Sequence, residues 1–413
     1  MSETFGQALR RLRGERSLRD VAQLAACGKS YVSDMENGRR WPTPAMAAAL
    51  DQALHANGQL IALAAMRPGL RPLEQVAALQ HDLRDTLAAG PVSSTCLDEW
   101  AYTVARHGRA TRYRPERELL PELLADIGDL RQVLAHRHPE PTRRRLVQCL
   151  AQLAGLMALT LLKLGDPAAR DWWRTGRAAA AAGEDRTTLA WMYAQEAYQL
   201  YYSGDLHGAV ELAARAQHYA GGLPCVGAAL AAPLGARALA QLGHGEETAA
   251  ALEAAEAALE RLPAEQRIGS AFGYSEAQLA FHSGNAWTHL GNVPRAAEQH
   301  ERALGLYPDS DHTDRTLIRL DQAMCRAHGG DAAAAAALAT ETIVSLPPAH
   351  RSALIIFRAR EVAARVPEAQ AVSEVRVLRE ILALPPGERA GMINGSGDAD
   401  DGEGRRGDLP AHR

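Results

Sequence analysis

Polar and basic side chains near the N-terminus have the types and spacing that suit contact with DNA. Lys29, Ser30, Ser33 and Asp34 fall about one helical turn apart, so a helix would project them together toward base edges in the major groove. Lys29 would favour guanine, and Asp34 could accept from the amino group of cytosine. Because a carboxylate also repels phosphates, a local structural role for Asp34 is an equal alternative. Donors to phosphate oxygens are expected from a second set, which comprises Ser17, Asn37, Arg39 and Arg40.

The sequence predicts five short helices over residues 5–54, and three of them position these side chains. Residues 5–13 carry apolar residues at helical spacing. Ser17 is a suitable N-cap for a helix over residues 18–25, with Asp20 as the second member of a weak capping box. A turn at residues 26–28 leads into a helix over residues 29–36, which Asn37 and Gly38 end. Two helices joined by so tight a turn are typical of the DNA-reading helix-turn-helix motif.

This stretch resembles the phage-repressor-like, or xenobiotic-response-element, family of helix-turn-helix domains. The resemblance is carried by Leu9-Arg10-x-Leu12-Arg13, Val21-Ala22, Lys29-Ser30-Tyr31-Val32-Ser33 and Glu36-Asn37-Gly38-Arg39-Arg40-x-Pro42. It implies an internal ion pair between Arg10 and Glu36. Family members often begin the second helix with Gln, and Leu18 stands there instead, so base recognition rests more on Lys29 and Ser33. The expected core of the domain, which spans residues 1–66, consists of Val21, Ala25, Val32, Met35, Leu50 and Leu54.

Composition favours an all-α fold for the whole chain. Of the 413 residues 47% are hydrophobic, but only 5% are aromatic, and the apolar fraction is carried by the helix formers Ala and Leu. The net charge of −4 hides an uneven distribution, because residues 1–66 hold eight basic and six acidic residues. Residues 1–66, the expected DNA-binding domain, therefore carry a net positive charge, and the remainder of the chain carries a net negative charge. The charge of the whole chain does not exclude a nucleic-acid partner.

The middle of the chain repeats. Gly followed by a polar residue recurs at Gly165, Gly204, Gly243, Gly291 and Gly330, at intervals of 39, 39, 48 and 39 residues, and small residues recur at matching offsets. A period of this size predicts a helical solenoid. The pattern resembles the tetratricopeptide repeat, although the copy at Gly165 fits less well because Arg170 and Arg177 replace small residues. We expect a linker at 67–73, the solenoid at 74–386 (best defined over 150–345) and a disordered tail at 387–413.

Aromatic residues gather in one short segment of this solenoid. In the resembling repeat, Trp191, Tyr198, Tyr201 and Tyr202 occupy first-helix positions that face the concave groove. An aromatic wall opposite polar groups suits a peptide or small-molecule effector. Packing between Ala-rich helices is an equally good explanation of the tyrosines. The polar positions expected opposite them are Arg237, Gln241, Asn285 and His289.

No pattern typical of catalysis or of a cofactor is present. His136 and His138 have no third ligand nearby, so a metal site is not expected, and the five cysteines lie far apart without a CxxC pair. The chain also lacks a basic-then-apolar leader, which predicts a cytoplasmic protein. Arg greatly outnumbers Lys, which occurs only at Lys29 and Lys163, and this bias indicates a GC-rich, actinobacterial genome.

These observations predict a sequence-specific DNA-binding transcriptional regulator that is not an enzyme. Its repeat domain is expected to form the homodimer and to sense an effector. The layout resembles repressor-type regulators of Gram-positive bacteria whose tetratricopeptide domain binds signalling peptides, and a small-molecule effector is the alternative to a peptide. A different class of function also fits, in which the repeat groove makes the protein an interaction scaffold and the helix-turn-helix serves mainly for docking.

Overall fold

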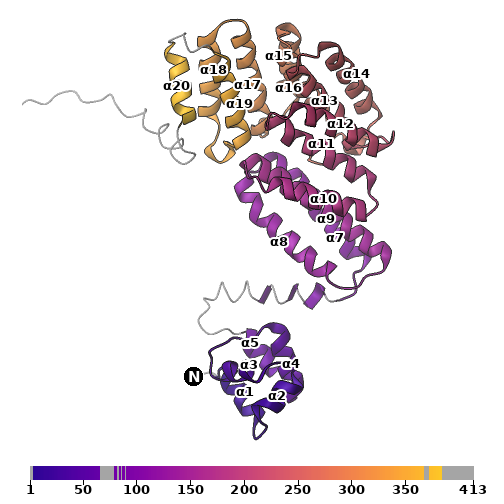
Figure 1. Ribbon diagram of the computed structural model, residues 1–413, viewed down its shortest axis with the longest axis vertical. Helices are drawn as coiled ribbons and strands as arrows, with labels where there is room; N and C mark the ends of the chain where they lie inside the picture. Colours follow the sequence, from indigo (N-terminus) through magenta and orange to yellow (C-terminus); the bar gives the residue numbers. More distant parts are fainter. Residues whose placement is uncertain are drawn as a thin grey trace, which may run out of the picture. The chain divides into compact units, whose positions relative to one another are not determined.

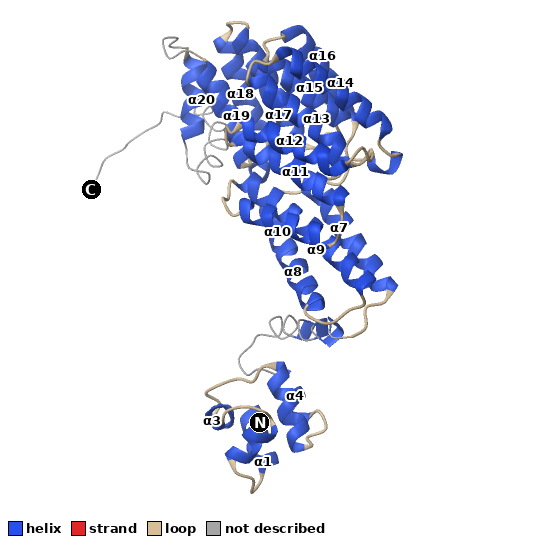
Figure 2. Cartoon of the chain, turned by 45° about the vertical axis from the view of Figure 1, so that its right-hand side comes forward, coloured by secondary structure: helices blue, strands red, loops and turns tan. Residues whose placement is uncertain are grey.

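The structure is a computed structural model, and it describes residues 3–65, 79–80, 83–84, 86–88, 90–366 and 372–383. The predicted linker at 67–73 and tail at 387–413 lie outside the described residues. Every regular element in these ranges is a helix, which confirms the all-α prediction (Figure 2). The chain forms two compact units, Met1–Val92 with Arg131–Arg137 and Ser93–Leu130 with His138–Arg413, and each is described separately.

The N-terminal unit contains five helices between Phe5 and Ala65. Only four of them lie within the predicted range of 5–54, because the fifth begins at Gln59. Thr4 and Ser17 both form capping boxes, in which each side chain accepts from a backbone N–H of the first turn. The five helices are α1 (Phe5–Arg13), α2 (Leu18–Leu24), α3 (Lys29–Glu36), α4 (Pro44–Leu54) and α5 (Gln59–Ala65).

The predicted core of this unit is confirmed, since all six of its expected members are buried. Sequence reasoning missed Asp51, which is buried at the C-terminal end of α4. Its carboxylate accepts from the backbone N–H groups of Gly58 and Leu60 at 2.8 and 2.9 Å, and so ties α4 to the start of α5. Gly6 allows α1 to cross α3 closely, because a Cβ there would lie 2.7 Å from the carbonyl oxygen of Glu36.

The second unit is a series of antiparallel helix pairs, consistent with an α-solenoid (Figure 1). The first helices of successive pairs (α9, α11, α13, α15, α17, α19) pack on one another and form an inner layer. The series also closes on itself, because α19 contacts α9 and α17 contacts α7. The helices are α7 (Ser94–Tyr113), α8 (Glu116–Leu134), α9 (Glu140–Leu164), α10 (Ala169–Ala182), α11 (Arg186–Tyr202), α12 (Leu206–Ala220), α13 (Val226–Gln241), α14 (Gly245–Arg261), α15 (Glu276–His289), α16 (Val293–Leu306), α17 (His312–His328), α18 (Ala332–Ser345), α19 (Ala353–Arg365) and α20 (Ser373–Ala383), with short 3-10 turns at Ala264–Gln266 and Pro348–His350.

The repeating Gly-polar pair is the turn between the two helices of a pair. All five of these glycines adopt a left-handed backbone, with φ between 72° and 83°, as glycines that end a helix commonly do. The polar residue that follows often caps the second helix. Asp205, for example, accepts from the backbone N–H of Gly208, and Asp331 accepts from that of Ala334. One residue pair thus ends one helix and begins the next.

The less regular copy at Gly165 is also a helix pair. Arg170 and Arg177 stand where other copies have Ala, but the buried small residues Ala169 and Gly176 lie one position earlier and take that role in α10. Its partner α9 is the only helix among the described residues that is long and apolar enough to cross a membrane. Because 72% of its apolar window is buried, α9 has the surroundings of a core helix.

A substitution at Gly227 tests the close contact between α11 and α13. A Cβ at this position would lie 2.4 Å from the backbone nitrogen of Trp191, and a backbone atom cannot yield as a flexible side chain can. We expect Gly227→Ala to lower the free energy of unfolding by about 2 kcal/mol in urea titrations. The matched control is Gly305→Ala on α16, where nothing lies within 4 Å, and this change should stabilise by about 0.5–1 kcal/mol. Equal effects at the two positions would contradict the close crossing.

Candidate functional site

Helix α3 lies between two tight turns that fix its direction. On its N-terminal side, Ala26 adopts a left-handed backbone with φ of 50°, and the N–H of Cys27 donates to the carbonyl of Ala22 at 2.8 Å. On its C-terminal side, Gly38 has φ of 68°. The buried Val32 and Met35 hold the inner face of α3 in the core of the domain. The remaining face of the helix is therefore directed outward in a fixed orientation.

The four residues predicted to contact bases differ in how freely they can do so. Lys29 and Ser30 are exposed, and within residues 3–65 neither side chain has a hydrogen-bonding partner. Ser33 and Asp34 are half-buried, and the Ser33 hydroxyl accepts weakly from the Asn37 amide at 3.4 Å. All four lie on α3, as predicted, but Lys29 and Ser30 at its start are the most accessible. Base contact itself stays a prediction.

All four residues predicted to contact phosphate already use polar groups within the fold. The amide of Asn37 donates to the carbonyl of Ser33 at 2.7 Å and accepts from Arg10 at 3.0 Å. The backbone N–H groups of Arg39 and Arg40 both donate to the carbonyl of Asp34, so these backbone donors are not free for phosphate. Ser17 accepts from the N–H at the start of α2, as the predicted N-cap.

The guanidinium groups of Arg39 and Arg40 remain as phosphate donors. Both side chains are exposed. Arg40 lies over the ring of Tyr31 on α3, with 4.3 Å between the guanidinium carbon and the ring centroid. This cation–π contact holds the Arg40 side chain against the outward face of the helix. Arg39 has no partner among the described residues and is free to adapt to a phosphate.

The predicted ion pair between Arg10 and Glu36 is confirmed, and Arg13 joins it. Arg10 does approach Glu36, at 3.5 Å, but the shorter contacts come from Arg13, whose Nε and Nη2 donate at 2.6 and 3.2 Å. Arg13 lies one helical turn after Arg10, at the end of α1, where its side chain reaches both oxygens of the buried carboxylate. Arg10 divides its guanidinium between Glu36 and Asn37. The pair links α1 to α3 and is structural, as expected.

Pairing leaves positive charge at both ends of α3. The arginines of α1 are paired, Arg11 with Glu3 and both Arg10 and Arg13 with Glu36. Lys29 at the first position of the helix, and Arg39 and Arg40 after its end, have no carboxylate within 4 Å among residues 3–65. A DNA duplex attracts such cations through its phosphates. The outward face of α3, which could contact base edges, therefore has positive charge without a carboxylate partner at both of its ends.

The residues predicted to line an effector groove do meet in the structure, but as a largely buried network. The Tyr201 hydroxyl contacts Asn285, Gln241 and His289 at 3.0, 2.7 and 3.1 Å. Burial raises the pKa of Tyr201 to about 12 and holds the pKa of His289 well below its ordinary value. Arg237 donates to Asn285 at 2.7 Å and to the hydroxyl of Tyr202 at 3.1 Å.

Two members of the predicted groove remain next to open space, and one lies apart. Tyr198 and Tyr202 line a cavity inside the solenoid. Trp191 is 3% exposed, and its indole N–H donates to the carbonyl of Ala271 at 2.7 Å, so it belongs to the core rather than to a groove. Packing between helices therefore accounts for Trp191 and Tyr201. Tyr198 and Tyr202 line the cavity and are the two aromatic residues of the predicted groove that can contact an effector there.

Sequence reasoning missed the charged residues of this cavity. Arg112 on α7 contacts Asp311 and Asp314 at 2.9 and 2.5 Å, across about half of the chain. No pattern of residue spacing within one segment predicts such a contact. The interval of 48 residues between Gly243 and Gly291 was a usable signal, because the extra segment before α15 carries Ser270 and Ala271 into the cavity wall.

Comparison with known proteins supports the N-terminal part. Residues 4–64 match a family model described as a helix-turn-helix domain. No curated protein and no solved structure matches the chain. The matched range covers all of α1–α4 and nearly all of α5. The chain therefore consists of an N-terminal helix-turn-helix domain followed by a long all-helical region.

Proposed function

We propose that this protein is a sequence-specific DNA-binding transcriptional regulator. The helix-turn-helix match indicates DNA binding and transcriptional regulation. The observation that carries the proposal further is the outward face of α3. Within residues 3–65, Lys29 and Ser30 are exposed there without hydrogen-bonding partners, and arginines without a carboxylate partner follow the helix. Side chains so placed can contact base edges while the flanking arginines hold phosphates.

The finer parts of the proposal rest on the sequence. The resemblance to phage-repressor-like domains places α3 in the major groove. One such domain offers few base contacts, so we propose a homodimer that binds two half-sites about 34 Å apart. We assign dimerisation and effector sensing to the tetratricopeptide-like solenoid. We propose that the protein is cytoplasmic and has no catalytic role.

A gel-shift experiment at two salt concentrations tests this function. The full chain is incubated with DNA from upstream of its own gene and with a shuffled duplex of equal length. We expect preferential binding of the upstream DNA and a steep loss of affinity for both duplexes between about 50 and 200 mM salt. Absence of binding to either duplex at low salt would instead favour the scaffold function.

Lys29→Ala should reduce discrimination between sequences. Lys29 is exposed at the start of α3, so its loss should cost about 1–3 kcal/mol at a matched base and little on random DNA. The measurement is the ratio of Kd values for operator and shuffled DNA, by fluorescence anisotropy. Arg11→Ala is the control, because Arg11 already pairs with Glu3 at 2.8 Å. An unchanged ratio in Lys29→Ala would exclude a base contact by this residue.

A further inference from the structure

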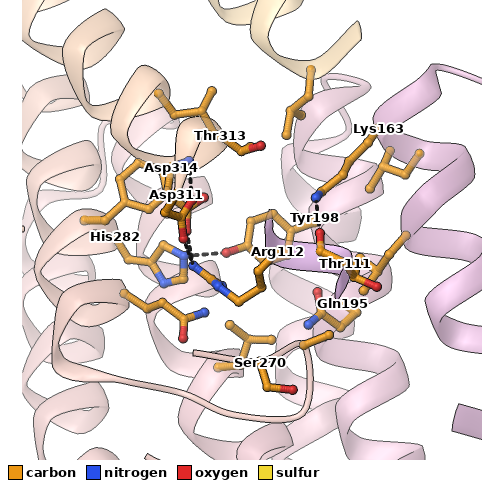
Figure 3. A pocket seen from close by; sticks show the side chains of 18 of the residues that line it. Thr111, Arg112, Lys163, Gln195, Tyr198, Ser270, His282, Asp311, Thr313 and Asp314 are labelled. Atoms are coloured by element: carbon orange, nitrogen blue, oxygen red, sulfur yellow. Dashed lines mark hydrogen bonds and ion pairs between the residues drawn. The ribbon is translucent and has the colours of Figure 1, made fainter. Parts of the chain in front are cut away.

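The inner layer of the solenoid and α7 border a partly open cavity of about 110 Å³ (Figure 3). All of the inner helices from α7 to α19 contribute to its wall, and the segment between α14 and α15 contributes Ser270 and Ala271. One part of the lining is apolar, with Leu159, Leu230 and Phe281 among its members. Because the cavity lies where the two ends of the helix series meet, an occupant would contact both ends at once.

Each charged group in the wall already has an oppositely charged partner. Arg112 is shared by Asp311 and Asp314, and Lys163 lies 3.3 Å from Glu116 and donates to the carbonyl of Thr111 at 2.7 Å. Burial, together with Arg237 and Arg112, holds the pKa of His282 well below its ordinary value, so this ring is neutral between the hydroxyls of Tyr198 and Tyr274. A cation or an anion would enter this low-dielectric space without a free counter-charge.

Several polar groups in the wall have no partner. Gln195 and Thr313 are 8% and 7% exposed, and within the described part of the chain their side chains form no hydrogen bond. Among the described residues, the Nε–H of Arg112 is the one polar group of this wall that is itself fully buried without a partner. Leaving a buried polar group unsatisfied costs stability. Arg112 can only donate hydrogen bonds, and the amide of Gln195 has two N–H donors. A ligand with acceptor oxygens would therefore satisfy most of these groups.

We infer that this cavity binds an uncharged, mainly apolar small molecule that carries carbonyl oxygens. The apolar wall would hold its body, and Arg112, Gln195 and Thr313 would hydrogen-bond its oxygens. Such a molecule would be the effector of the regulator proposed above, and only this biological role of the ligand rests on the proposed function. Binding can be measured without DNA, so failure here is distinguishable from failure of the regulatory proposal.

Three compounds with the same six-carbon chain separate the chemical classes. Hexanamide is neutral and bears a carbonyl, hexanoate is an anion, and hexylamine is a cation. With the full chain and millimolar compound, we expect hexanamide to raise Tm by about 2–4 °C, while the two ions leave it unchanged. No shift with hexanamide, or an equal shift with all three compounds, would overturn the inference.

Two variants place the binding in this cavity. Gln195→Leu keeps the volume of the side chain but removes its donors, so hexanamide affinity by calorimetry should fall about tenfold. Leu230→Trp fills the apolar side and should abolish the Tm response in a protein that stays helical. The matched control is Gln299→Leu on α16, which lies outside the cavity and should bind normally. Equal binding by Gln195→Leu and Gln299→Leu would refute the assignment.

Discussion

Asp321→Asn is expected to lower the free energy of unfolding of the repeat unit by roughly 3 kcal/mol. Asp321 on α17 is 1% exposed and lies between two other inner helices. It accepts from the amide of Asn285 at 2.8 Å and from the Nε of Arg358 at 2.7 Å. Among the described residues, the substitution leaves the buried Arg358 with Glu361, at 2.7 Å, as its one remaining carboxylate partner. A buried cation that loses its main counter-ion destabilises far more than a lost surface pair.

Thermal and urea unfolding of the full chain measure this effect. Three kcal/mol corresponds to a fall in Tm of about 5 °C for a unit of this size. Glu211→Gln is the control, because Glu211 pairs with Arg215 at 3.0 Å on the exposed face of α12 and should cost less than about 0.5 kcal/mol. Removing both charges, as in Asp321→Asn with Arg358→Met, should recover part of the loss. If Asp321→Asn alone costs no more than Glu211→Gln, the network does not stabilise the fold.

The helix pairs were predictable because their signals are local. A left-handed Gly and the polar cap that follows it are adjacent in sequence, so Gly204 and Asp205 identify a turn without knowledge of the rest of the chain. The same holds for the helix-turn-helix domain, whose core positions follow helical spacing. The copy at Gly165 fitted poorly because Ala169 and Gly176 are displaced by one residue, which a fixed offset cannot detect.

The cavity, its ion pairs and the contact of Arg13 with Glu36 were not predicted, because they depend on contacts between distant segments. Arg112 meets Asp311 only because the solenoid closes on itself, and one helical turn decides whether Arg10 or Arg13 is the nearer partner of Glu36. The aromatic cluster did identify the right region. Its composition could not show that Tyr201 would find its partners inside the protein, since those partners lie on other helices.

The double substitution Arg39→Ala with Arg40→Ala should weaken binding to operator and shuffled DNA alike, by about 100-fold at 50 mM salt. The two guanidinium groups are exposed beside α3, whereas the backbone N–H groups of the same residues are bonded to Asp34. The substitution therefore removes charge without removing the backbone turn. Two lost charge-assisted contacts account for about 3 kcal/mol. They should also reduce the slope of log K against log salt by about 1.8.

Conservative variants separate charge from geometry in this loop. Arg39→Lys with Arg40→Lys keeps both charges, so the salt slope should stay close to that of the parent protein. Tyr31→Leu removes the ring on which Arg40 lies and leaves the charge in place, so it should weaken binding only a few-fold. Anisotropy titrations at four salt concentrations give both quantities. If the double Ala variant keeps its affinity and slope, these arginines do not contact phosphate, and the positive charge used for DNA must lie elsewhere. If instead it loses affinity for the operator alone, Arg39 and Arg40 read bases, because phosphate contacts cannot distinguish one sequence from another.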